Sequence, residues 1–263
     1  MKKRLIIFFI LFSAIAFGQN QELSATKIGF VALDCDQFLK YDQFGFYYYI
    51  KNNILFKTKE KESFEYKNIS LGEITKVDLL NPLTIILFYE NFNTAVLLDN
   101  QLNETQKINF SENDEPLIVT EVGIASQNRV WIYNSLTQKI GLFDYLKNTY
   151  QPISTSIQGD LKWYHSDFNT FQWIDESLNW YSCDLFGKIT LIGKVSDFDQ
   201  IQITEDNAIV FSKDKKLYLH DFKKDILYTI DIVEKSFRYF YYKDQILSIF
   251  TPQLITNFKI SKL

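Results

Sequence analysis

The sequence is poor in the residues on which metal centres, disulfide scaffolds and phosphate loops depend. Its 263 residues include two Cys, two His, one Met, nine Gly and four Pro. Two histidines leave little room for a zinc site, which typically takes two or three of them together with a carboxylate. The low cysteine, glycine and proline content excludes a disulfide-rich, collagen-like or low-complexity chain, and no Gly-rich phosphate loop occurs. We therefore expect no metal, no bound nucleotide and no other cofactor.

Arginine is scarce too, and acidic residues exceed basic ones. Beyond residue 18 only Arg129 and Arg238 remain, and removal of the three basic residues before this point changes the formal charge from −4 to about −7. An acidic chain disfavours nucleic acid and anionic membranes as partners. The scarcity of arginine also excludes sites built on arginine clusters, which commonly hold phosphates and carboxylates.

The N-terminus has the three parts of a secretory signal peptide. Basic residues stand at positions 2–4, an unbroken apolar run covers 5–12, and small residues at 16 and 18 precede a cleavage point before Gln19. The apolar stretch is shorter than the roughly 20 residues that a membrane-spanning helix needs. No Cys follows the cleavage point, as it would in a bacterial lipoprotein, and no later apolar run reaches spanning length. We therefore predict a cleaved signal peptide over residues 1–18 and a soluble exported chain, periplasmic or associated with the outer membrane.

After Gln19 the sequence is typical of a series of short strands. Runs of four to seven β-branched and aromatic residues alternate with short clusters of Asn, Asp, Lys and Gly, without a sustained apolar pattern at helical spacing. In six places a strand ends in an apolar pair followed by Asp, or in a variant of this pattern. These strand ends are Leu55-Phe56-Lys57, Leu97-Leu98-Asp99, Leu142-Phe143-Asp144, Ser182-Cys183-Asp184, Leu219-His220-Asp221 and Ile255-Thr256-Asn257. They recur every 36 to 45 residues, a period that fits four short strands with their turns.

Six such units fill residues 19–263, which we predict to be one all-β domain. The period favours a single six-bladed β-propeller of four-stranded antiparallel blades. The last unit has only three strands, whereas residues 26–33 form an additional apolar stretch ahead of the first unit. An N-terminal strand that completes the last blade would close the ring and cover an exposed edge. The alternative is a large antiparallel sandwich or an open barrel, whose hairpins would recur without a long period.

In this period, in its size and in its export signal, the chain resembles the β-propeller superfamily, and in particular uncharacterised exported propellers of Gram-negative Bacteroidota. The resemblance extends over essentially the whole mature chain. The signature motifs of the better-known propellers are missing from the sequence: the Gly-His and Trp-Asp pairs, the double Gly of kelch repeats, the Ser-x-Asp-x-Gly-x-Thr box of sialidases and the calcium-binding Asp-x-Asp-x-Asp-Gly. The activities of those families are therefore disfavoured.

Charged residues recur on the predicted inner strands, which line the central channel of a propeller. Lysine or arginine stands at corresponding places in four units, with a carboxylate or an imidazole nearby in three of them. We predict a candidate ligand-binding site at the channel mouth, formed by Lys40, Asp42, Lys76, Asp78, Lys162, His165 and Arg238. The cations would hold an anionic group, and Asp42, Asp78 or His165 would act as acid or base. In the alternative, these groups pair with one another and with water in a solvated channel.

Other conspicuous residues have structural interpretations. Because Asp side chains accept backbone hydrogen bonds in tight turns, we interpret the Asp residues that end four of the third strands, Asp99, Asp144, Asp184 and Asp221, as turn formers. Most aromatic residues are expected to pack between blades. Cys35 and Cys183 fall about half a ring apart, too far for a disulfide. The run from His165 to Asp167 does not make a catalytic triad, because neighbouring residues in a strand point to opposite faces.

The leading functional hypothesis is a non-catalytic scaffold. The chain consists almost entirely of predicted propeller and lacks a recognisable catalytic constellation. By analogy with propellers of the envelope and of secretion machinery, we expect an exported protein-binding scaffold or accessory subunit of the bacterial cell envelope, whose partner is another envelope protein. The alternative is a channel-mouth enzyme, or a receptor for small anionic ligands or glycans.

Overall fold

The computed structural model describes residues 21–204, 208–232, 237–251 and 253–261. Within these ranges the chain forms 24 β-strands and two short 3-10 segments, η1 (Glu90–Phe92) and η2 (Phe110–Glu112). No helix among the described residues is long and apolar enough to cross a membrane. The predicted signal peptide, residues 1–18, lies outside the described residues.

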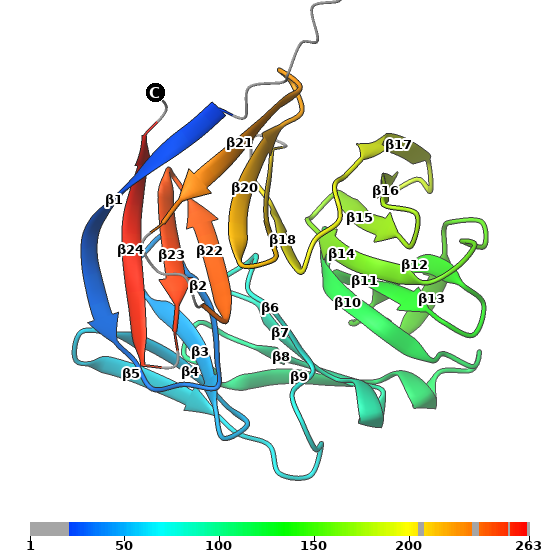
Figure 1. Cartoon of the computed structure of the whole chain (residues 1–263). Helices are drawn as coiled ribbons and strands as arrows, with labels where there is room; N and C mark the ends of the chain where they lie inside the picture. The colour runs from blue at the N-terminus through cyan, green and yellow to red at the C-terminus, as the bar shows by residue number, and fades with distance from the viewer. Residues whose placement is uncertain (1–20, 205–207, 233–236, 252, 262–263) are drawn as a thin grey trace, which may run out of the picture.

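The strands form successive four-stranded antiparallel sheets, which are the blades of a propeller (Figure 1). Blade 1 consists of β2 (Gln37–Tyr41), β3 (Tyr47–Lys51), β4 (Ile54–Lys59) and β5 (Glu62–Tyr66). Blade 2 consists of β6 (Lys76–Asp78), β7 (Ile85–Tyr89), β8 (Thr94–Leu98) and β9 (Glu104–Asn109). Blade 3 consists of β10 (Val119–Ala125), β11 (Arg129–Asn134), β12 (Lys139–Asp144) and β13 (Thr149–Pro152).

The second half of the chain repeats this arrangement. Blade 4 consists of β14 (Leu161–Ser166), β15 (Thr170–Asp175), β16 (Asn179–Asp184) and β17 (Ile189–Lys194). Blade 5 consists of β18 (Gln200–Ile203), β19 (Ile209–Lys213), β20 (Lys216–Asp221) and β21 (Ile226–Asp231). Blade 6 has β22 (Tyr239–Lys243), β23 (Ile246–Phe250) and β24 (Leu254–Ser261), and takes its fourth strand, β1 (Gln21–Ala32), from the start of the described chain. The predicted six-bladed propeller is thus confirmed.

Strand β1 closes the ring as predicted and extends further than the sequence indicated. From Ser24 to Ala32 it pairs antiparallel with β24, the third strand of blade 6. Its first residues, Gln21 to Ser24, pair parallel with β21, the outer strand of blade 5. Blades 5 and 6 therefore belong to one eight-stranded sheet rather than to two separate sheets. The strand can reach both blades because it is 12 residues long, more than twice the length of a typical inner strand such as β22.

The core lies between the blades. Six clusters of buried hydrophobic residues each join two neighbouring blades, including blades 6 and 1. At this last interface the ring of Phe38 on blade 1 stacks on Phe250 of blade 6, with the ring centroids 4.0 Å apart. Trp131 and Trp180 are fully buried. Wide aromatic side chains fill the space between diverging sheets, which confirms the interpretation of most aromatic residues as core.

The Asp residues at the ends of third strands form turns, as predicted. Asp99 Oδ1 accepts hydrogen bonds from the backbone N–H groups of Gln101 and Asn103 at 2.8 and 2.9 Å. Carboxylates in the same position of later blades accept from backbone N–H groups two to four residues further on: Asp144, Asp184 and Asp221. The recurrent Asp is therefore a feature of the hairpin between the third and fourth strands.

Candidate functional site

A central channel of about 1410 Å³ runs between the inner strands of the six blades. Residues of β2, β6, β10, β14, β18 and β22 all line it, and these strands surround the centre of the ring in Figure 1. Each inner strand is the end strand of its sheet, so its unpaired edge faces the channel, and consecutive residues such as 75–80 and 161–167 line it. The wall combines lysines, carboxylates, glutamines and aromatic rings.

Five of the seven residues predicted for a channel site line this one channel: Lys40, Lys76, Asp78, Lys162 and His165. Asp42 and Arg238 do not. Asp42 Oδ1 accepts from the backbone N–H groups of Phe44 and Phe46 at 2.9 and 3.0 Å, which makes it another turn former. Arg238 is exposed ahead of β22, and its backbone N–H donates to the carbonyl of Phe250 at 2.7 Å.

Lys76 is paired with a residue that was not predicted for the site. Its Nζ forms an ion pair and hydrogen bond with Glu121 on the inner strand of blade 3, and lies 4.6 Å from the ring centroid of Tyr164 on blade 4. The Tyr164 hydroxyl donates to the backbone carbonyl of Val122 at 2.9 Å. Burial raises the pKa of Glu121 although Lys76 opposes this shift, and burial together with Glu121 holds the pKa of Tyr164 well above 10. This cluster links three blades, so it closes part of the channel wall.

Asp78 is also engaged with backbone groups. Its Oδ1 accepts from Leu80 at 2.8 Å within blade 2, and its Oδ2 accepts from Ile124 of blade 3 at 2.7 Å. A carboxylate with both oxygens committed in this way is a poor general base unless these hydrogen bonds are broken.

His165 is the one imidazole in the channel wall. Burial lowers its pKa below 6.5, and Lys40 acts in the same direction, whereas Asp78 and Asp167 oppose the shift. Its ring lies nearly parallel to that of Trp163, at 15° and with centroids 6.1 Å apart. The structure therefore brings residues of blades 1, 2 and 4 within electrostatic range of one another. A neutral imidazole is favoured near neutral pH.

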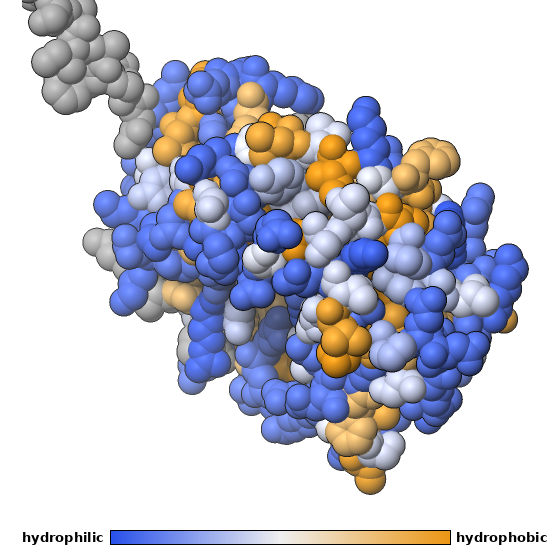
Figure 2. All heavy atoms as spheres, turned by 90° about the vertical axis from the view of Figure 1, so that its right-hand side faces the viewer, coloured by the Kyte–Doolittle hydropathy of each residue, from blue (hydrophilic) through white to orange (hydrophobic). Residues whose placement is uncertain are grey.

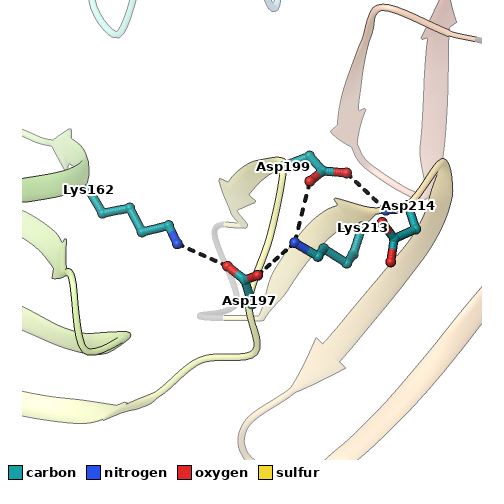
Figure 3. Close-up of polar contacts among 5 residues, drawn as sticks. All are labelled: Lys162, Asp197, Asp199, Lys213 and Asp214. Atoms are coloured by element: carbon teal, nitrogen blue, oxygen red, sulfur yellow. Dashed lines mark hydrogen bonds and ion pairs between the residues drawn. The ribbon is translucent and has the colours of Figure 1, made fainter.

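Lys162 belongs to a charged network between blades 4 and 5 (Figure 3). Its Nζ donates to Asp197 Oδ1 at 2.9 Å, and Lys213 Nζ donates to Asp197 Oδ2 at 2.6 Å. Lys213 also lies 3.6 Å from Asp199 Oδ1, whose other oxygen accepts from the backbone of Asp214 at 2.9 Å. The hydrogen bonds from Lys213 and Lys162 hold the pKa of Asp197 well below its usual range. The network links the two blades beside the channel.

Two acids that neutralise channel lysines, Glu121 and Asp197, were not among the predicted site residues. Glu121 stands on the inner strand of the third unit, which, like the fifth, had no predicted cation. Asp197 lies between two blades, where a repeat pattern carries no information. No three His, Cys, Asp or Glu side chains lie together as a metal site in the part of the chain that the structure describes. Both cysteines are free thiols.

Comparisons with known proteins place the fold. No protein-family model matches the chain, and no curated protein matches it significantly. A member of the DUF4221 family from Bacteroides vulgatus superposes with a TM-score of 0.63 at 9% identity, over 93% of this chain and 100% of that one. An inactive virginiamycin B lyase from Staphylococcus aureus, solved with quinupristin, gives 0.57 at 12% identity, over 92% and 96%. YCF48 bound to D1 peptide gives 0.55 at 9% identity, over 87% and 82%.

These similarities show the β-propeller fold of the chain and no more, because identities near 10% do not transfer function. Similar rings serve a lyase and a protein that binds a peptide. The function of this chain must therefore be argued from its own side chains.

Proposed function

We propose that this protein is an exported, non-catalytic β-propeller that acts as a protein-binding scaffold or accessory subunit in the bacterial cell envelope, together with outer-membrane or secretion machinery. One observation carries the proposal: the charged groups in the channel wall are largely engaged with one another or with backbone, while large apolar side chains lie exposed on the outside of the ring. Lys76 is paired with Glu121 and Lys162 with Asp197. Such pairing leaves few charged groups in the channel wall to act as catalytic acids or bases.

Two further observations support the proposal. The basic and apolar start of the sequence is typical of an export signal, and the binding of a peptide by YCF48 is an instance of a similar ring holding a protein segment. Many exposed apolar residues, among them Phe186 and Leu191, lie on outer strands and turns, although Tyr239 of the inner strand β22 lines the channel. Contiguous exposed apolar surface commonly marks a protein interaction site.

Cross-linking in intact cells tests this function. A C-terminally tagged chain is expressed from its own signal, and we expect a mature N-terminus at Gln19, recovery in the envelope fraction and one reproducible cross-linked protein. A version lacking residues 1–18 is the control and should remain in the cytoplasm without that partner. A chain that retains residues 1–18, or that is monomeric and yields no reproducible partner from intact envelopes, contradicts the proposal.

A second candidate function is the binding of a small anionic ligand in the channel. The observation in its favour is that Lys40, Lys76, Lys162 and His165 line one cavity, whose volume of about 1410 Å³ exceeds that of most small-molecule sites. Inorganic phosphate, citrate and glucuronate serve as probes in thermal unfolding. A stabilisation by one of them that is lost in Lys40→Gln and kept in Lys147→Gln, a surface control, supports the candidate. If none of the probes shifts the unfolding temperature, the candidate is rejected for these ligand classes.

A further inference from the structure

The outer strand of blade 4 is unusually apolar for an exposed edge. Strand β17 pairs with β16 on one side, and no other strand among the described residues pairs with its second edge. Its first four residues are all exposed, with Ile189, Leu191 and Ile192 at 37%, 58% and 41%. Phe186, in the turn that leads into the strand, is 92% exposed. Four large apolar side chains thus lie in solvent within one short segment.

The other outer strands carry devices that discourage edge pairing. Charged side chains on an edge, short length, proline and coverage by another element all have this effect. Strand β5 contains Glu62 and Glu65, and β9 contains Glu104 and Lys107. Strand β13 is four residues long and ends at Pro152, β21 is covered by β1, and β1 has Lys27 and a bulge at Ile28. Strand β17 has no charged residue and no proline from Ile189 to Gly193, and no described strand covers its second edge.

Figure 2 views the molecule from the right-hand side of Figure 1, where β17 lies. Hydrophobic residues gather on the upper part of this face, between polar ones. The register between β16 and β17 shifts at Ile192, which forms a bulge. The regular part of the edge is therefore limited to residues 188–191. The edge therefore suits a short extended segment rather than a long added sheet.

Charge at the two ends of β17 indicates what kind of segment fits. Lys188 and Lys194 flank the apolar residues, are exposed, and form no ion pair with any described residue. The nearby Asp184 carboxylate is engaged by the backbone N–H groups of Phe186 and Lys188. A second copy of β17 fits poorly, because an antiparallel pair centred on Leu191 would place Lys188 opposite Lys194 at both ends, and like charges directly opposite destabilise a strand pair.

We propose that β17 is the docking edge for an extended segment of the partner protein, in which apolar side chains alternate and acidic residues stand at the ends. The segment adds a fifth strand to blade 4. Its backbone forms hydrogen bonds with the free edge of β17, apolar residues cover Ile189 and Leu191, and its carboxylates pair with Lys188 and Lys194. This inference rests on the proposed function, since it names the surface and the chemistry of the same protein partner.

A peptide experiment on the mature full-length chain tests the edge. The probe is a short fluorescein-labelled peptide in which Val and Thr alternate between paired Asp residues at its two ends, and the comparison peptide has Lys in place of Asp. We expect the Asp-ended peptide to bind at least about 10-fold more tightly than the Lys-ended one. Leu191→Asp should weaken that binding at least about 10-fold, whereas Leu83→Asp, at a similarly exposed position on blade 2 (66%), should leave it unchanged.

A charge swap separates recognition from damage to the fold. In the double variant Lys188→Glu with Lys194→Glu, the preference should invert, so that the Lys-ended peptide binds more tightly than the Asp-ended one. Equal binding of both peptides by the wild-type chain, or binding that Leu191→Asp does not weaken, overturns the proposal. A concentration-dependent dimer that Leu191→Asp abolishes in sedimentation velocity also overturns it, in favour of a second copy of the chain.

The same variants distinguish this inference from the proposed function. If the envelope partner is cross-linked by wild type and by Leu191→Asp alike, the scaffold function stands and the β17 edge is rejected. If wild type captures no partner but binds the Asp-ended peptide through β17, the edge stands and the envelope role is rejected.

Discussion

Asp78 Oδ2 accepts a hydrogen bond from the backbone N–H of Ile124, with 2.7 Å between the two atoms. The carboxylate belongs to the inner strand of blade 2, and the N–H belongs to the inner strand of blade 3. The second oxygen, Oδ1, accepts from the backbone of Leu80 at 2.8 Å. Asp78 therefore joins two neighbouring blades and lines the channel at the same time.

Asp78→Asn should destabilise the protein by about 1 to 3 kcal/mol, because an amide keeps one acceptor oxygen and turns its NH₂ group toward a backbone donor. Chemical denaturation of the mature chain measures this loss. Asp167→Asn is the matched control. Asp167 Oδ1 accepts hydrogen bonds from the backbone N–H groups of Asn169 and Thr170 in its own turn. Its Oδ2 accepts from the Thr170 hydroxyl, and this hydroxyl can become the acceptor when an amide NH₂ replaces Oδ2. We expect that control to lie within about 0.5 kcal/mol of wild type, and equal losses in the two variants would contradict the role of Asp78.

His165 should make stability fall in mild acid. Burial lowers its pKa below 6.5 in the folded state, so below about pH 6.5 the unfolded chain binds a proton that the folded chain does not. The titration of His165 therefore does not affect the free energy of unfolding well above pH 6.5, and it lowers that free energy as the pH falls below this value. The free energy of unfolding should drop less between about pH 7.5 and pH 5 in His165→Gln than in wild type, by about 1.4 kcal/mol for each unit of lowered pKa.

An NMR titration provides the independent measurement. The imidazole of His165 should titrate with a midpoint below 6.5. It should move lower still in Asp78→Asn, because Asp78 is the larger of the two carboxylate influences that raise this pKa. A midpoint at or above 6.5 would show that burial does not outweigh the neighbouring carboxylates.

Gly187→Ala should be among the more damaging glycine substitutions. Gly187 has a φ of +82°, and a Cβ there would lie 2.0 Å from the backbone oxygen of Ile153 on the neighbouring blade. Gly159 has the same φ of +82° with nothing within 4 Å of its Cβ position. We expect a loss of about 2 to 4 kcal/mol for Gly187→Ala and about 1 kcal/mol for Gly159→Ala. Equal losses in urea denaturation would mean that the backbone angle alone, and not the contact between blades, requires glycine at position 187.

Removal of β1 should open the ring. A chain without residues 19–33 loses the strand that covers both β24 and β21, and free edges promote aggregation. Light scattering during heating should show aggregation far out of proportion to the residues removed. A milder variant, Leu23→Ala, removes a side chain that is 2% exposed between blades 5 and 6 and should cost about 2 to 5 kcal/mol. The exposed Ile28→Ala serves as its control, and a truncated chain that melts like wild type would refute the closure.

Both thiols should react slowly in the folded protein. Burial raises the pKa of Cys35 to about 11, with Asp36 and Asp34 adding to the shift, and burial raises the pKa of Cys183 to about 12. Thiolates are the reactive form, so labelling near pH 8 should be slow for the native chain and rapid after denaturation. Two thiols should then be counted without reductant, and one in Cys35→Ser. A disulfide between Cys35 and Cys183 would contradict the order of the blades.

The sequence by itself determined the number of blades and the way the ring closes. The strand ends at Asp99, Asp144 and Asp184 recur because the hairpins of blades 2 to 5 use a carboxylate that accepts backbone N–H groups, and such local chemistry is visible in a repeat. Closure was visible as well, since a three-stranded last unit and a spare N-terminal strand complement each other. The lysines of the inner strands were found for the same reason, because periodicity places them on strands that face the channel.

Only the tertiary structure decided what those residues meet. Lys76 and Glu121 are 45 positions apart, and Lys162 and Asp197 are 35 apart, so each pair forms across a blade boundary where the angle and depth of two sheets set the contact. The same holds for the parallel pairing of β1 with β21, and for the exposure of the apolar side chains of β17. Local propensity and period define a strand, whereas its neighbours in space determine whether its side chains are buried, paired or left in solvent.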